Sequence, residues 1–296
     1  MRAFTPVEQR IDDAARRLLA RGPASGARAA LIEFLVFGAK QAWACVFGAA
    51  LLAVILAARL WYPDDAALAR NDLLTLAAVA LQIVMIATRL ETGRELWVVV
   101  LFHVVGTGME LFKTDVGSWS YAADGVLRLG AVPLFSGFLY ASVGSYMVRI
   151  HRLFDLRFER WPRRWLTGVV AVLIYVNFFS HHSLPDARWL LVAAVGALWV
   201  RSTMVYRVHR GSHRMPLLVA FALVATFIWL AENIATSAGA WLYPDQLDGW
   251  HVVSPSKLVS WFLLMIVSVV LVTSVYRPRA PDPVAAVKPE ADDAAG

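Results

Sequence analysis

Two glutamates, each set in an apolar stretch and followed by the same residue pattern, are the strongest candidates for chemistry in this sequence. Residues 110–121 read ELFKTDVGSWSY and residues 232–243 read ENIATSAGAWLY, and the two segments align without a gap. We call residues 110–121 the first motif and residues 232–243 the second motif. The matched pairs are Glu110 and Glu232, Thr114 and Thr236, Gly117 and Gly239, Trp119 and Trp241, and Tyr121 and Tyr243.

Acid–base catalysis is the chemistry that such a pair of carboxyl groups can perform. A carboxylic acid kept away from water is favoured in its protonated form and can donate a proton. We predict that one of Glu110 and Glu232 protonates a carbon–carbon double bond, while the other removes a proton or directs a water. Aromatic faces stabilise the resulting cation. The predicted substrate-binding residues are therefore those of the two motifs: Thr114, Trp119, Tyr121, Thr236, Trp241 and Tyr243.

His103 is a third catalytic candidate, because it lies seven residues before Glu110 and so on nearly the same helix face. A buried, hydrogen-bonded structural histidine is the alternative. The pair His181–His182 and the spacing of His209 and His213 resemble the histidine boxes of membrane di-iron desaturases. The two sets fall on opposite sides of the predicted membrane, so neither a metal site nor a cofactor is expected.

The composition indicates a membrane protein. Hydrophobic residues make up 59% of the 296 residues and charged residues 17%, and a spanning helix needs about 20 mostly apolar residues. We predict an all-α, polytopic membrane helix bundle with about eight spans. The spans are placed at residues 41–60, 73–90, 96–112, 129–148, 165–180, 189–206, 216–235 and 257–276.

The distribution of basic residues predicts the orientation. Most of the 28 Lys and Arg residues fall in the N-terminal segment, in alternate loops and in the tail, which places these parts in the cytoplasm. We therefore expect a multi-pass protein of the bacterial inner membrane with both termini cytoplasmic, and no nucleic-acid partner. Residues 1–29 should form an amphipathic segment, helical over 6–22, at the inner face. The tail, residues 277–296, should be disordered.

The repeated motif predicts an internal duplication. The first motif ends the third predicted span and the second ends the seventh, four spans later, so both copies have the same orientation. Repeats of this kind are related by an axis along the membrane normal. We predict two parallel four-helix repeats, residues 30–150 and 151–276.

Four segments resemble an uncharacterised bacterial membrane family, domain of unknown function 817. They are EFLVFGAKQAWACVF (33–47), the first motif, GAVPLFSGFLYASVGSYM (130–147) and the region from 232 to 265. The spacing Glu110-x6-Gly117-x3-Tyr121, followed by Val-Pro-Leu at 132–134, more distantly resembles membrane carotenoid hydratases. Small duplicated bundles with intramembrane Glu also resemble the membrane lycopene cyclases. These resemblances imply a lipophilic isoprenoid or polyene substrate. The sequence departs from both families, because Trp119 interrupts the Gly–Tyr stretch and the second motif is a full copy of the first, so the particular substrate is left open.

Three functions remain open on the sequence alone. The first is an enzyme that cyclises, isomerises or hydrates such a substrate without a redox cofactor. The second is a small-solute or proton-coupled carrier, although matching Gly or Pro interruptions at mid-span, typical of carriers, are missing. The third is a membrane scaffold with membrane lipid as its partner, in which each Glu bonds the Thr four residues on and the Trp and Tyr form an interfacial belt.

Overall fold

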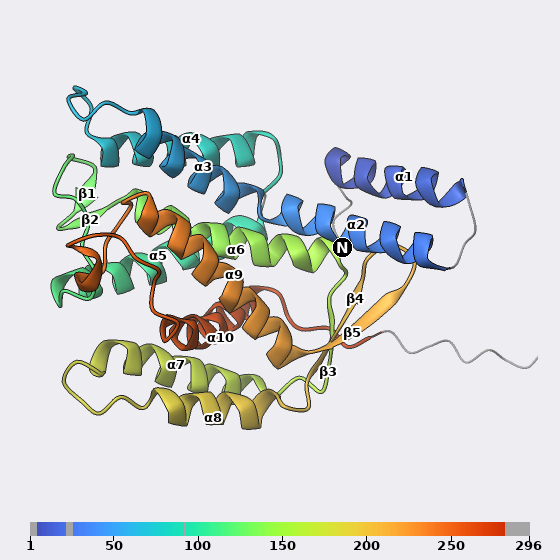
Figure 1. Cartoon of the computed structure of the whole chain (residues 1–296). Coiled ribbons are helices and arrows are strands. Elements are labelled where there is room, and N and C mark those ends of the chain that lie inside the picture. Colours follow the sequence, from blue (N-terminus) through green and yellow to red (C-terminus); the bar gives the residue numbers. More distant parts are fainter. Residues whose placement is uncertain (1–4, 22–25, 92, 282–296) are drawn as a thin grey trace, which may run out of the picture.

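The computed structural model describes residues 5–21, 26–91 and 93–281. Within these residues the chain is mostly helical, with two small antiparallel sheets (Figure 1). The α-helices are α1 Pro6–Ala20, α2 Ala27–Ala44, α3 Val46–Trp61, α4 Arg70–Ala87, α5 Arg94–Asp115, α6 Phe135–Leu153, α7 Arg164–Ser180, α8 Arg188–Trp199, α9 Leu217–Ser237 and α10 Lys257–Val275. The short elements are β1 Arg128–Leu129, β2 Val132–Pro133, β3 Arg157–Glu159, β4 Thr203–Arg207, β5 Ser212–Pro216 and the 3-10 turn η1 Pro244–Gln246.

The helices form a flat, layered bundle. Helices α5, α6, α9 and α10 make its centre, with the α3–α4 hairpin on one side and the α7–α8 hairpin on the other (Figure 1). Helix α3 packs on α6, and α7 packs on α10. Both motifs lie at the end of the bundle that carries β1 and β2, which we call the motif end. Helix α1 and the sheet β3–β4–β5 lie at the opposite end, which we call the α1 end (Figure 1).

Both motifs terminate their helices in the same way. Gly117 after α5 and Gly239 after α9 have φ angles of 70° and 68°, in the left-handed region that glycine adopts without steric cost. The amide of the next residue then donates to the carbonyl five residues back, at 2.8 Å for Ser118 and 3.0 Å for Ala240. This bond is typical of a Schellman cap. The chain therefore leaves the bundle at the same point of each motif.

Four helices, α4, α5, α9 and α10, are long and apolar enough to cross a membrane. Helices α2 and α3, which meet at a 64° bend, make a fifth candidate if they count as one span. Helices α7 and α8 are apolar but shorter. A membrane protein with four or five candidate spans is thus what the structure supports. Each of the eight predicted spans overlaps a helix, but the span predicted at 129–148 is wrong over its first residues, because β1 and β2 precede α6, and α6 is not among the candidate spans.

The predicted span at 189–206 is wrong over its last residues. Helix α8 ends at Trp199, and Thr203–Arg207 form strand β4 between β3 and β5. At 1.5 Å per residue, the 12 residues of α8 reach about 18 Å, well short of a 30 Å bilayer core. The segment TMVYR is rich in residues that favour strands, and β5 offers it an antiparallel partner along its whole length.

Helix α1 covers the α1 end of the bundle. A capping box at Thr5 and Glu8 starts it, and Ala15 and Leu19 pack in a cluster with Phe154 and other apolar residues. Its acidic side chains also form buried ion pairs: Glu8 with Arg152 at 2.8 Å, and Asp12 with Lys40 at 3.0 Å. The predicted amphipathic helix is therefore present, and its apolar face packs on protein. Most of the tail, residues 282–296, lies outside the described residues.

Candidate functional site

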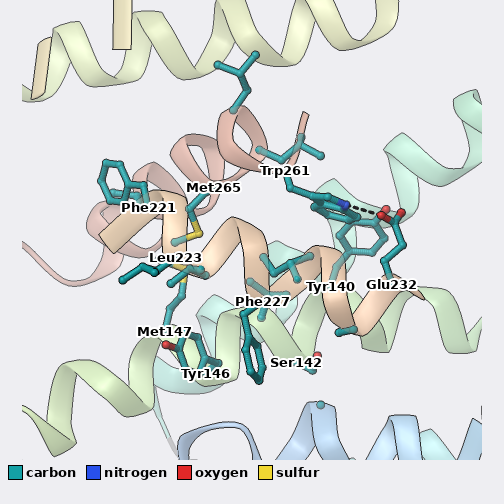
Figure 2. Close-up of a pocket in the computed structure, with 18 of the residues that line it drawn as sticks. Tyr140, Ser142, Tyr146, Met147, Phe221, Leu223, Phe227, Glu232, Trp261 and Met265 are labelled. Carbon is teal, nitrogen blue, oxygen red and sulfur yellow. Dashed lines mark hydrogen bonds between the residues drawn. The ribbon is translucent and has the colours of Figure 1, made fainter. Parts of the chain in front are cut away.

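A cavity of about 1130 Å³ runs through the centre of the bundle. Its walls come mainly from α6, α9 and α10, and they are predominantly apolar (Figure 2). Lining residues on α6 and just beyond it extend from Leu139 to Phe154, which at 1.5 Å per residue is a length of about 22 Å. Figure 2 shows Glu232 at one end of the view and Tyr146 and Phe221 farther along the cavity. The space therefore suits a long apolar molecule, with carboxyl groups near one end.

Glu110, only 4% exposed, is held by three hydrogen-bond donors. Its Oε2 accepts from Trp119 Nε1 and Tyr121 Oη, both at 2.8 Å, and its Oε1 accepts from Tyr140 Oη at 2.7 Å. Gly106, one turn earlier on α5, leaves the space that Tyr140 fills, since a Cβ there would lie 2.4 Å from Cγ of that ring. The close approach of α5 and α6 thus fixes the tyrosine that reaches Glu110.

Glu232, only 3% exposed, is held by two donors. Tyr243 Oη bonds its Oε1, and Trp261 Nε1 on α10 donates to its Oε2 at 2.7 Å (Figure 2). The tyrosine eleven residues after the glutamate therefore bonds it in both motifs. The helix that follows each motif, α6 or α10, supplies a further aromatic donor.

The two motifs are joined by a backbone bridge between equivalent positions. Ser120 and Leu242 form an isolated antiparallel pair, and each amide donates to the other residue's carbonyl, at 2.9 and 3.0 Å. Both residues are the eleventh of their motif. At this bridge the two motifs are therefore related by a local two-fold axis.

The aromatic rings of the two motifs make contacts related by the same local two-fold axis. The Trp119 ring packs against Tyr243 with centroids 6.2 Å apart, and the Trp241 ring lies 6.5 Å from Tyr121. Each contact joins the tryptophan of one motif to the tyrosine of the other. The four rings form a single aromatic group between the two carboxyl groups.

Most of the predicted site residues meet at the cavity. Both glutamates and the Trp and Tyr of both motifs line it. Thr114 and Thr236 do not; their hydroxyls donate to the backbone carbonyls of Glu110 and Asn233. The structural alternative is thus met in part: each glutamate side chain bonds a neighbouring helix, through Tyr140 or Trp261, but neither bonds the side chain of the Thr four residues on. His103 also stays outside the cavity, with its ring 4.4 Å from that of Phe138.

Sequence reasoning missed several residues that contact the carboxyl groups or line the same end of the cavity. Tyr140 and Trp261 donate to the two glutamates from the following helices. Their positions nearly match at the offset between the motifs, and this is a signal that the sequence did contain. Lys113, Lys257, Arg188 and His182 also line the motif end of the cavity.

The hydrogen bonds define where a proton can sit on each glutamate. A tryptophan Nε1 only donates, so Oε2 of each carboxyl group is an acceptor. A tyrosine hydroxyl can donate or accept, and one bonds each Oε1. Oε1 is therefore the oxygen that can carry a proton in both sites. In the described ranges no three His, Cys, Asp or Glu side chains gather as a metal site requires.

Comparison with known proteins places the chain in a family. YoaT of Bacillus subtilis (strain 168), described as an uncharacterized protein, is 40% identical over 254 residues, which cover 86% of this chain and 96% of YoaT. A crystal structure of a cross-linked MvINS trimer covers 63% of this chain and 96% of its own, at 16% identity and a TM-score of 0.45, too weak a similarity for an argument. The family described as protein of unknown function (DUF817) matches residues 33–269. This chain belongs to that family.

Proposed function

We propose that this protein is a membrane enzyme that performs acid–base chemistry on a long lipophilic molecule of the isoprenoid or polyene class, without a redox cofactor. One observation carries the proposal: Glu110 and Glu232, which come from separate copies of the motif, line the same elongated apolar cavity. A cavity of this kind with a few convergent polar groups is typical of a ligand site. Intramembrane carboxyl groups that face a cavity are typical of functional ones.

The proposed reaction begins with proton transfer from one carboxyl group. The acid's O–H bond breaks, a C–H bond forms at one carbon of a double bond, and a carbocation remains on the other carbon. The second carboxylate then removes a proton from a neighbouring carbon, which gives an isomerised or cyclised product, or it directs a water, which gives an alcohol. The proton count balances in each case, and no oxidant or reductant is needed.

The aromatic group between the carboxyl groups suits the cationic intermediate. The rings of Trp119, Tyr121, Trp241 and Tyr243 line the cavity, and a desolvated cation over such a ring gains up to about 2 kcal/mol. The apolar walls keep water away from the cation except where a carboxylate directs it. These features support an acid–base enzyme over a scaffold, which has no use for the cavity.

The proposal includes the membrane arrangement of eight spans in two parallel repeats, residues 30–150 and 151–276, with both termini in the cytoplasm of the bacterial inner membrane. In this arrangement α8 is a short span across a locally thinned bilayer. Shifted by 122 residues, α5 and α6 would span 216–237 and 257–275, and α9 and α10 span 217–237 and 257–275. The bridge between Ser120 and Leu242 also joins equivalent positions. Both observations support a duplication, and the clusters of Arg at the α1 end support the orientation.

Solvent deuterium tests the proposed reaction. The purified protein is incubated in D₂O with a lipid extract of the expressing cells, and separately with lycopene, squalene or geranylgeraniol, and the lipids are analysed by mass spectrometry. We expect deuterium in one lipid class, because the acid proton exchanges with solvent before it is transferred to carbon. The variant with Glu110→Gln and Glu232→Gln together should transfer none.

The matched control is Glu159→Gln, because Glu159 lies on β3, is paired with Arg214 and does not line the cavity. This variant should label the lipid as the wild type does. Equal labelling by the wild type and the double variant, or no labelling of any lipid, would contradict the proposed function.

A further inference from the structure

Lys113 is a buried cation at the motif end of the cavity. It lies three residues after Glu110 on α5 and is 2% exposed. Its Nζ lies 2.9 Å from Nε2 of His182 and 4.2 Å from the ring centroid of Phe178. An ammonium group only donates, so this imidazole nitrogen must be unprotonated. Neither neighbour supplies a negative charge, although a buried charge is costly without one.

Lys257 is a second cation at the same end. It is the first residue of α10, is partly buried and lines the cavity, with Nζ 4.1 Å from the ring centroid of Tyr243. Over the described ranges, neither Lys113 nor Lys257 has a carboxylate oxygen within 4.0 Å. Both ammonium groups therefore face the cavity with aromatic rings and a neutral imidazole as their neighbours.

Within the described ranges the nearby carboxylates make no ion pair with either lysine. Glu110 and Glu232 accept from uncharged tryptophan and tyrosine donors, and the charge of Lys257 acts on Glu232 from beyond 4.0 Å. Asp186 pairs with Arg188 at 3.2 Å, and Arg188 also lines the cavity. The motif end of the cavity thus gathers two lysines, an arginine and a histidine, and neither lysine is ion-paired with a carboxylate of the described residues.

We propose that this cationic group holds the phosphate of a long-chain isoprenyl phosphate, whose hydrocarbon chain fills the apolar part of the cavity. The inference rests on the proposed function and names its substrate class. An anion with several oxygens suits donors from different elements, here Lys113 on α5, Lys257 on α10 and Arg188 at the start of α8. Lys113 lies about 4.5 Å along α5 from Glu110, so the double bond nearest the head group is the one that reaches the carboxyl groups.

Binding to the purified full-length chain in detergent tests this inference. The probes are geranylgeranyl monophosphate, geranylgeraniol and inorganic phosphate, each titrated by calorimetry. We expect the isoprenyl phosphate to bind at least roughly tenfold more tightly than the alcohol, because charge-assisted bonds to two lysines are of that order. Inorganic phosphate, which lacks the chain, should bind more weakly than either.

Two variants remove the lysines, and one control removes a charge elsewhere. Lys113→Met and Lys257→Met should each weaken binding of the isoprenyl phosphate and leave binding of geranylgeraniol unchanged, which also shows that the variant is folded. Arg59→Met is the control, because Arg59 is an exposed cation on α3 that does not line the cavity. It should bind all three probes as the wild type does. If Lys113→Met does not fold, Lys257→Glu should reverse the preference by itself.

The outcomes separate this inference from the proposed function. A wild type that binds the alcohol and the isoprenyl phosphate equally, lysine variants that keep the preference, or inorganic phosphate bound as tightly as the lipid would each overturn it. A phosphate preference without any deuterium transfer would leave the inference standing and remove the proposed enzyme. Deuterium transfer without the preference would do the reverse.

Discussion

The two glutamate sites share a sequence pattern but differ in how firmly they are held. Glu110 has three donors, and the close packing of α5 on α6 fixes one of them. Glu232 has two donors, from Tyr243 and Trp261. Each donor to a carboxylate stabilises its charged form. We propose that the more heavily bonded Glu110 is the base of the reaction and Glu232 the acid, against the charge of Lys257, which favours the ionised form of Glu232.

The largest expected effect is a difference between the two single glutamate variants in product formation and in the labelling of unreacted substrate. Glu110→Gln and Glu232→Gln should each reduce product formation roughly 10²- to 10⁴-fold, the usual contribution of a general acid or base. Only Glu110→Gln should still place deuterium in unreacted substrate, because the acid can protonate the double bond and take a proton back. Mass spectra of the remaining substrate in D₂O check this. Deuterium in the substrate of Glu232→Gln alone would exchange the two roles.

The next largest effect on turnover is expected when one tyrosine hydroxyl is removed from each glutamate site. Tyr243→Phe removes the only hydrogen bond that the structure shows to Oε1 of Glu232, whereas Tyr121→Phe leaves Oε2 of Glu110 bonded to Trp119. We expect turnover to fall roughly tenfold for Tyr243→Phe and less for Tyr121→Phe. Rates of deuterium transfer measure both. An equal loss in the two variants would show that the third donor of Glu110 has no effect.

A stability test examines the close packing beside Glu110. Gly106→Ala should cost about 1–3 kcal/mol of unfolding free energy, because its Cβ would overlap the ring of Tyr140. Gly108→Ala is the matched control on the same helix, since its Cβ would lie 3.7 Å from Tyr175 Oη, an ordinary contact. This control should be neutral or stabilised by up to about 1 kcal/mol. Thermal unfolding in detergent distinguishes them, and equal melting temperatures would argue against a fixed Tyr140.

The smallest effect concerns the helix caps, where the two motifs should behave alike. Gly117→Ala and Gly239→Ala each force a side chain into the left-handed region, at a cost of about 1–2 kcal/mol. The measurement is again thermal unfolding, with Gly168→Ala inside α7 as the control, since a Cβ there has nothing within 4 Å. A loss at only one cap would show that the two caps do not contribute equally to stability.

Internal repetition made part of the site predictable from the sequence. The shared spacing identified both glutamates and their tyrosines, and apolar run length placed the helices that carry them. The donors Tyr140 and Trp261 were missed because they lie on the helices that follow the motifs and because their offset of 121 residues is one short of the offset between the motifs. Lys113 lies inside the first motif, but its lack of a counter-ion is visible only once the neighbouring helices are in place.

Strand β4 was missed for a different reason. The apolar residues of β4, 204–206, follow the apolar run of α8 after three polar residues, 201–203, so a hydropathy window extends the helix through them. Pairing with β3 and β5 decides the outcome: β5 begins five residues after β4 ends, a hairpin spacing that the sequence contained, whereas β3 lies more than 40 residues earlier. Apolar character in that region therefore reflects burial at the α1 end as much as contact with lipid.

The buried ion pairs of α1 determine how much of the chain must be synthesised before this helix can dock completely. Glu8 meets Arg152, which leaves the ribosome 144 residues later, and Lys40, the partner of Asp12, also donates to the carbonyl of Val208, 168 residues beyond it. Helix α1 is made first, yet its complete docking site exists only after β4. Its docking can thus be complete only after α2 to α8 and β4 have been made, whereas α9 and α10 follow them in the chain.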